Sequence, residues 1–317
     1  MAIADKVKAL VAKVPELDPN VGEIIKKADL GKNPPREKVM AAVHKERPDL
    51  AALHVYPRHG KFTGPSWEDA VNIVGPILEG GKEAIVAVID MLQEVDDGKD
   101  YKARYVLHVI AQYCCRADKQ EQQDMAMGAL CSQVGGDRPK QIQKFLLQQL
   151  QVCGDKRVAG PIGKLLTDED VCDEAALALL AIGGAAAVEQ FRGALTKAKG
   201  KARLTAVQNL GVLRDAASAA ALREAAGDAD KDVQIAAVWA LANLGDAASV
   251  DILLKAADTK DWQRVQATKA CLMLAEKLAA SGKKNDAKRI YTHLRDTRKA
   301  EPESYIRQAA IKALEAL

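Results

Sequence analysis

The segment between Arg203 and Ala257 contains one pattern twice, at a constant offset. The tetrapeptide Asp-Ala-Ala-Ser at residues 215–218 recurs letter for letter at 246–249, and an Ala- and Leu-rich run precedes it each time. A self-similar period between about 20 and 50 residues is typical of solenoid proteins, in which each unit buries its apolar face only against its neighbours. The repeat therefore predicts a row of short stacked units rather than one central core.

Each unit has the pattern of a helix that ends in a tight turn. Between residues 233 and 244 the apolar side chains fall within a stripe of about 80° on a helix of about 3.6 residues per turn. The stripe consists of Val233, Ala237, Leu241 and Leu244. Gly245 is placed to end this helix in the left-handed conformation, and Asp246 to cap the next helix. Arg214 holds the place of Gly245 one unit earlier, so that turn is expected to be made differently.

The same rhythm of helices and turns is expected from Ser66 to the end of the chain. Residues 1–62 differ, because short helical segments are separated by prolines and a glycine and are followed by a loop across 50–65. We therefore divide the chain into an N-terminal helical cap with its loop (1–62) and a repeat solenoid (63–317). Within the solenoid, helices are expected near 67–79, 83–94, 101–115, 118–133, 138–152, 156–167, 171–182 and 262–280.

The unit resembles the HEAT repeats of bacterial proteins. Its pattern is Val/Ile-Gln/Arg-x-Ala-Ala-x-x-Ala-Leu-x-x-Leu-Gly-Asp, followed by an Ala- and Leu-rich helix. The match is strong over 155–257 and 303–317 and moderate over 66–154. The resemblance implies an all-α, right-handed α–α superhelix of the armadillo-like kind. In such a solenoid two helices form each unit, and the second helices line the concave surface.

The resemblance also bears on ion pairs between units. The arginine that such repeats often place second in the second helix is kept at Arg203 and Arg307. Glutamine holds that place at 234 and 266, and cysteine holds it at 172. A continuous ladder of Asp–Arg pairs from unit to unit is therefore not expected.

Bulk composition narrows the functional classes. Hydrophobic residues make up 48% of the chain but aromatic residues only 4%, so the apolar side chains are mostly small or straight and suit close helix packing. A net charge of +3 is too balanced to mark a nucleic-acid binder. The sequence contains no run of about 18 apolar residues, so it predicts no membrane span. The six cysteines lack paired spacing and are expected to be reduced, which predicts a cytoplasmic protein.

No catalytic or metal-binding constellation is found. The five histidines form no His-x-x-x-His pair, and the sequence contains no Cys-x-x-Cys and no phosphate-binding Gly-Lys-Ser/Thr. The absence of a His-Glu dipeptide argues against the iron-binding helical-repeat hydroxylases. We expect a protein that is not an enzyme, with no catalytic residues, no cofactor and no metal. The basic segment 283–299 is expected to be a solvated cap, with contact to nucleic acid or an acidic partner as the alternative.

Trp239 is the first candidate for contact with a partner. It lies about 240° round the helix from Val233, off the core stripe, and its counterparts in earlier units are Gln208 and Leu177. An exposed tryptophan is favoured at interaction hot spots, but the ring could equally fill the gap between adjacent units. The candidate residues on this side are Trp239, Ile235, Gln208, Leu204 and Asp173.

The loop across 50–65 is the second candidate. A loop of this length without regular structure is uncommon in compact domains and is often functional. Its aromatic and cationic side chains favour contact with a partner over metal binding. The residues concerned are His54, Tyr56, Arg58 and His59.

The predicted function is a non-catalytic, monomeric scaffold that binds a partner protein through the concave surface, the 50–65 loop or both. The alternative is a nucleic-acid-binding or DNA-repair protein of the HEAT-like alkylpurine DNA glycosylase kind, with Trp239, Asp173 and Arg203 in its groove. Segments 171–182 and 233–244 contain no Lys or Arg. Because phosphate contacts dominate nucleic-acid binding, nucleic acid is the less favoured partner.

Overall fold

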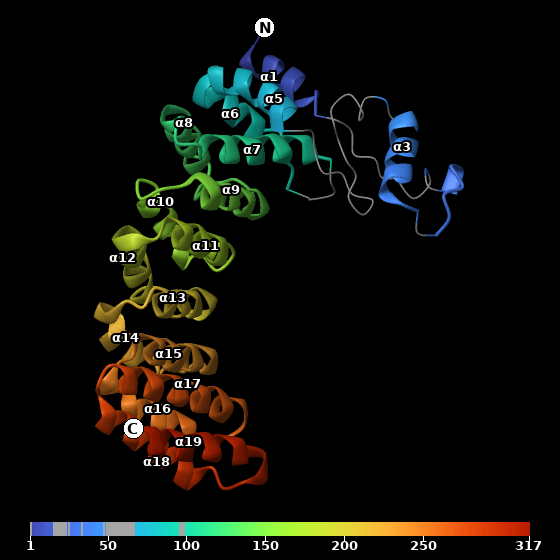
Figure 1. Cartoon of the computed structure of the whole chain (residues 1–317). Coiled ribbons are helices and arrows are strands. Elements are labelled where there is room, and N and C mark those ends of the chain that lie inside the picture. The colour runs from blue at the N-terminus through green and yellow to red at the C-terminus, as the bar shows by residue number, and fades with distance from the viewer. Residues whose placement is uncertain are drawn as a thin grey trace. The chain divides into compact units, whose positions relative to one another are not determined.

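Every regular element of the described residues is a helix, which confirms the all-α prediction (Figure 1). The computed structural model describes residues 2–14, 24, 26–32, 34–46, 48, 67–94 and 99–317. These residues belong to two compact units, Met1–Val158 and Ala159–Leu317. The domain boundary expected after residue 62 falls outside the described residues. None of the helices in these ranges has the length and apolar character that a membrane span requires.

The helices of the first unit pack in two rows. In one row α6 contacts both α1 and α8, and in the other α7 contacts both α5 and α9. The rows are held together by contacts between consecutive helices, such as α5 with α6 and α8 with α9. The helices are α1 (Ile3–Val11), α3 (Arg36–Glu46), α5 (Trp67–Glu79), α6 (Gly81–Ile89), α7 (Tyr101–Cys114), α8 (Gln120–Cys131) and α9 (Lys140–Cys153).

The second unit consists of consecutive helical pairs. Within a pair the first helix packs on the second, as α12 does on α13, and the second helices α11, α13, α15 and α17 contact one another in sequence (Figure 1). The first helices are α10 (Ala159–Gly163) with the 3-10 turn η1 (Lys164–Thr167), α12 (Gly184–Leu195), α14 (Ala219–Ala225) after η2 (Ala216–Ser218), α16 (Val250–Ala257) after η3 (Ala247–Ser249), and α18 (Lys284–Thr297). The second helices are α11 (Cys172–Ile182), α13 (Gly200–Val212), α15 (Lys231–Leu244), α17 (Asp261–Ala280) and α19 (Ser304–Ala316), the last preceded by η4 (Glu301–Glu303).

The apolar stripe expected on α15 is largely buried. Val233, Ala237 and Leu241 are at most 1% exposed, whereas Leu244 at the end of the helix is half-buried. The small residues beside the stripe let the neighbouring helix come close. A Cβ atom added to Gly211 of α13 would lie only 2.7 Å from the Cβ atom of Ala240. The backbones of α13 and α15 therefore meet with almost no side chain between them.

The turns after α13 and α15 are alike, although the sequence predicted a difference between them. Gly245 is left-handed, with φ 75° and ψ 31°, as expected. Arg214 also adopts a positive φ of 52°, so the expectation of a different turn at Arg214 was wrong. The reason lies in the hydrogen bonds that follow. The amide of Asp215 donates to Leu210 O, and the amide of Asp246 donates to Leu241 O, and both bonds need the left-handed residue before them.

The repeated Asp-Ala-Ala-Ser tetrapeptide joins neighbouring first helices. Asp246 stands at the start of η3, but its carboxylate caps no backbone amide. It accepts instead from Ser249 Oγ and, at 2.6 Å, from Arg223 Nη1 of α14. One unit earlier Asp215 accepts from Ser218 Oγ and, at 2.6 Å, from Arg192 Nε of α12. The predicted capping role of Asp246 was therefore wrong. The tetrapeptide instead provides an aspartate that binds an arginine of the preceding first helix.

A second set of ion pairs joins the second helices to the following unit, and it is interrupted. Arg203 Nε of α13 lies 2.7 Å from Asp228 Oδ2, and Arg264 Nε of α17 lies 2.7 Å from Glu303 Oε1. Between them α15 carries Gln234. The expected break in the ladder is therefore present at Gln234. The prediction that Gln266 holds the position of the repeat arginine on α17 was wrong, because Arg264 holds it.

Candidate partner-binding site

Four of the sequence-predicted residues lie together on the second helices of the second unit. Leu204 and Gln208 of α13 and Ile235 and Trp239 of α15 line one groove of about 490 Å³. We call it the tryptophan groove. Its remaining lining residues are Asp232 and Ala236 of α15 and Trp262, Gln266, Lys269, Ala270 and Met273 of α17. The predicted residues His54, Tyr56, Arg58 and His59 lie outside the described residues.

The contribution of α17 to the groove was missed from the sequence. Trp262, Gln266, Lys269 and Met273 occur at spacings of four, three and four residues, which places them on one face of a helix. That spacing was the signal available.

Trp239 is both partly exposed and packed against the neighbouring repeat. Its side chain is 39% exposed. Its ring edge also rests on α13, since a Cβ atom at Gly211 would lie 2.8 Å from Trp239 Cζ3. The ring therefore fills part of the gap between the repeats that contain α13 and α15, and it still presents a face to solvent. Trp262, at the start of α17, is 64% exposed.

The lining of the groove carries one acidic and one basic side chain. Asp232 and Lys269 are both exposed, and the other polar residues are the amides Gln208 and Gln266. The rest of the lining is apolar. The groove is therefore mostly apolar, with one charge of each sign.

Asp173, the fifth predicted residue of this face, is not part of the groove. Its carboxylate lies 2.7 Å from Lys201 Nζ and accepts from Thr205 Oγ1 at 2.8 Å. Burial opposes ionisation of Asp173, but the hydrogen bonds from Lys201 and Thr205 outweigh it and lower the pKa of this carboxyl. Asp173 thus ties α11 to α13.

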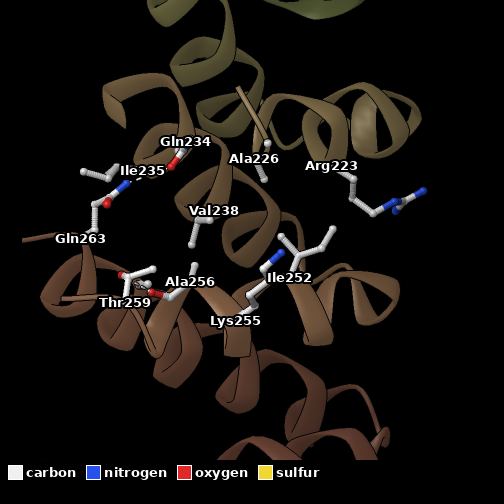
Figure 2. A pocket seen from close by; sticks show the side chains of 12 residues that line it. Arg223, Ala226, Gln234, Ile235, Val238, Ile252, Lys255, Ala256, Thr259 and Gln263 are labelled. Atoms are coloured by element: carbon white, nitrogen blue, oxygen red, sulfur yellow. Dashed lines mark hydrogen bonds between the residues drawn. The ribbon is translucent and has the colours of Figure 1, made fainter. Parts of the chain in front are cut away.

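A second hollow of about 350 Å³ lies beside the groove and shares Ile235 with it (Figure 2). We call it the Gln234 hollow. The first helices α14 and α16 and the second helices α15 and α17 all contribute to it. Its other lining residues are Arg223, Ala226, Gly227, Gln234, Val238, Ile252, Lys255, Ala256, Thr259, Gln263 and Ala267.

The thiols are poorly suited to nucleophilic chemistry. Burial raises the pKa of Cys114, Cys153 and Cys271 to about 12, so these thiols stay protonated near neutral pH. Among the described residues no group of His, Cys, Asp and Glu side chains is arranged to hold a metal ion.

The sequence match to a known family falls on the units that form both hollows. Residues 191–275 match HEAT repeats, which confirms the resemblance stated from the sequence. A search of curated proteins found no match.

Several solved structures are similar to the chain over most of its length. An engineered protein from a structural genomics consortium is 19% identical with a TM-score of 0.42, covering 99% of this chain and 98% of that one. A designed armadillo repeat protein in complex with the peptide (KR)4 is 19% identical with a TM-score of 0.32, covering 73% and 99%. The complex of CpcE and CpcF of phycocyanin lyase from Nostoc is 14% identical with a TM-score of 0.31, covering 90% and 96%. These likenesses are weak and identify no partner for this chain.

Proposed function

We propose that this HEAT-repeat protein is a non-catalytic scaffold that binds a partner protein through the tryptophan groove. The observation that carries the proposal is the pair of exposed rings in the groove, with Trp239 39% and Trp262 64% accessible. Tryptophan is over-represented among the few residues that dominate binding energy at protein interfaces. Two such rings along one groove favour a binding surface over an ordinary solvated face.

The packing beneath the groove supports this proposal. The helices that form it are held by the close contact of Gly211 with Ala240 and by the ion pairs of Arg203 and Arg264. Trp239 is braced against α13 and so loses little side-chain freedom when a partner covers it. A preorganised ring of this kind lowers the entropic cost of association.

We also propose that the protein is cytoplasmic. This proposal and the absence of catalysis are both supported by the properties of the thiols. Nucleophilic cysteines have lowered pKa values, whereas burial shifts the pKa of thiols in this chain upward, as at Cys114 and Cys271. Free thiols such as these fit a reducing compartment. We further propose that the chain is a monomer, which sedimentation at several concentrations would test.

The test compares groove variants with a variant of an exposed aromatic residue elsewhere. The tagged wild-type chain, Trp239→Ala and Trp262→Ala are used to capture proteins from cells, and the captured proteins are quantified by mass spectrometry. Truncation of a hot-spot side chain costs at least about 2 kcal/mol, so the purified partner is expected to bind each variant about 30-fold more weakly. Tyr305→Ala, at a 65% exposed site on α19, serves as the control and is expected to bind normally.

Two outcomes would contradict the proposal. One is a set of captured proteins that the groove variants retain as well as the wild-type chain does. The other is binding of duplex DNA at micromolar concentration that weakens steeply between about 50 and 200 mM salt, because that salt dependence reports phosphate contacts. The second outcome would favour the nucleic-acid alternative.

A further inference from the structure

Two arginines of the second unit close the gap between consecutive repeats in the same way. Arg203 pairs with Asp228 at 2.7 Å, and its Nη1 donates to Leu195 O at 2.7 Å. Arg264 pairs with Glu303 at 2.7 Å, and its Nη1 donates to Ala257 O at 3.3 Å. In each case a guanidinium joins the end of a first helix to an acidic residue that follows a later helix. The side chain fills the space between them.

The repeat between these two lacks both members of the pair. One period of the repeat after Arg203 the chain carries Gln234, and one period after Asp228 it carries Thr259. Gln234 Nε2 donates to Asp228 O, and its Oε1 accepts from Gln263 Nε2 at 2.9 Å. Thr259 Oγ1 turns back to Ala256 O at 2.6 Å. Neither side chain replaces the missing guanidinium.

The Gln234 hollow lies where that ion pair would be. Gln234 and Thr259 both line it, and so does Ala226, which occupies the position of Leu195 one unit later. The hollow is therefore a consequence of two residue changes in one repeat. At the equivalent place one repeat earlier, the guanidinium of Arg203 lies between Leu195 O and the carboxylate of Asp228.

The hollow combines an apolar wall with one positive charge that has no ion-pair partner among the described residues. Val238, Ile252 and Ile235 supply much of the apolar wall. Arg223 also lines the hollow, but it is paired with Asp246 at 2.6 Å. Figure 2 shows the ammonium group of Lys255 turned into the space between Val238 and Ile252, and the guanidinium of Arg223 turned away from it.

We infer that the Gln234 hollow binds a small apolar molecule that carries a single carboxylate. The apolar part would remove the faces of Val238 and Ile252 from water, which is favourable in proportion to the area buried. The carboxylate would pair with Lys255, since Arg223 is already neutralised by Asp246, so a monoanion matches the charge of the site. This inference does not depend on the tryptophan groove or on any partner protein.

The experiment titrates the full-length chain with octanoate and, separately, with 1-octanol. The two probes share the alkyl chain and differ in the charged group. Binding is followed by the methyl NMR signals of Val238, Ile252 and Ile235, which line the hollow. Saturable shifts confined to these methyl groups are expected for both probes, with octanoate the tighter ligand.

Variants separate the charge from the cavity. In Lys255→Met, octanoate is expected to bind about fivefold more weakly, as befits an accessible ion pair, while 1-octanol is unaffected. Lys288→Met, an exposed lysine on α18, is the matched control and should change neither probe. The double variant Gln234→Arg/Thr259→Asp restores the pair found at Arg203 and Asp228, and it should abolish binding of both probes.

A second filling variant, Ala226→Leu, keeps the test decisive if the double variant fails to fold, and circular dichroism checks folding in each case. The inference is overturned if octanoate binds Lys255→Met as tightly as the wild-type chain. It is also overturned if the filled variants still bind, or if no saturable shift occurs at the three methyl groups.

Discussion

Arg298 is the largest fully buried side chain of the described residues, although the sequence placed it in a solvated basic segment. Its Nη2 donates to Ala257 O at 2.6 Å and to Thr268 Oγ1 at 3.1 Å, while Nε has no hydrogen-bond partner within the described part of the chain. Burial, with the nearby charge of Arg264, lowers the pKa of Arg298. The interpretation of 283–299 as a wholly solvated cap was therefore wrong at this residue. Composition alone cannot show which arginine of a basic segment points inward.

Truncation of this buried side chain should be costly. Arg298→Ala is expected to lower the free energy of unfolding by about 3 kcal/mol, because it opens a cavity and leaves Ala257 O without its shorter hydrogen bond. Arg298→Met should cost less, since it keeps the apolar stem and removes the unsatisfied Nε. Urea denaturation followed by circular dichroism measures both. Equal losses for the two variants would show that charge and not packing matters here.

At the scale of elements, the helices and the turn at Gly245 could be predicted from the sequence, and the spaces between helices could not. Apolar spacing and glycine placement are local signals, and they located the ends of α5, α7 and α11 within a few residues. The segment expected as one helix over 156–167 is instead α10 followed by a 3-10 turn. Local periodicity does not distinguish these two helical forms.

The repeat register failed where the chain departs from its period. One full period after Gln234 falls on Val265, whereas the arginine that makes the ion pair is Arg264. The dipeptide Val265-Gln266 is also identical to Val233-Gln234, so the sequence pattern alone favours Gln266 as the counterpart of Gln234. The Gln234 hollow was therefore unforeseen. Four of the five candidates on the second helices did converge, because Leu204, Gln208, Ile235 and Trp239 follow the unbroken part of the period.

The Asp–Arg pairs between neighbouring first helices should make the free energy of unfolding fall at low pH. The hydrogen bond from Arg192 holds the pKa of Asp215 below its ordinary value. Because the folded pKa lies below the unfolded value of about 3.9, the stabilisation is complete above that value and is lost as pH falls through the folded pKa. Asp215→Asn is expected to cost about 2 kcal/mol at pH 7 and progressively less as pH falls through the folded pKa of Asp215.

Urea midpoints measured across this pH range test the expectation. Asp251→Asn is the control, because Asp251 pairs with Arg289 at the surface with its side chain 75% exposed. Exposed pairs contribute little, so this variant should follow the wild-type curve. A pH-independent difference between Asp215→Asn and the wild-type chain would refute the electrostatic explanation.

At the scale of the whole molecule, both hollows and the bonds that frame them belong to Ala159–Leu317. Stability in a repeat array is approximately a sum of the units and the interfaces between neighbours. The fragment 159–317 is therefore expected to fold alone, with a helical circular dichroism spectrum and a cooperative thermal transition. It should also keep the octanoate response of the full chain. A spectrum of a disordered chain would contradict this expectation.

The contact between Trp239 and Gly211 has a consequence for how the groove could change. The indole edge sits against bare backbone, where even one methyl group would come within 2.8 Å of it. Alanine at position 211 would also come within 2.7 Å of Ala240 Cβ and 2.9 Å of its Cα, so α15 would have to move away from α13 and carry the ring with it. Under the proposed function, the fit of the groove to a partner would thus depend on a residue that the partner does not touch.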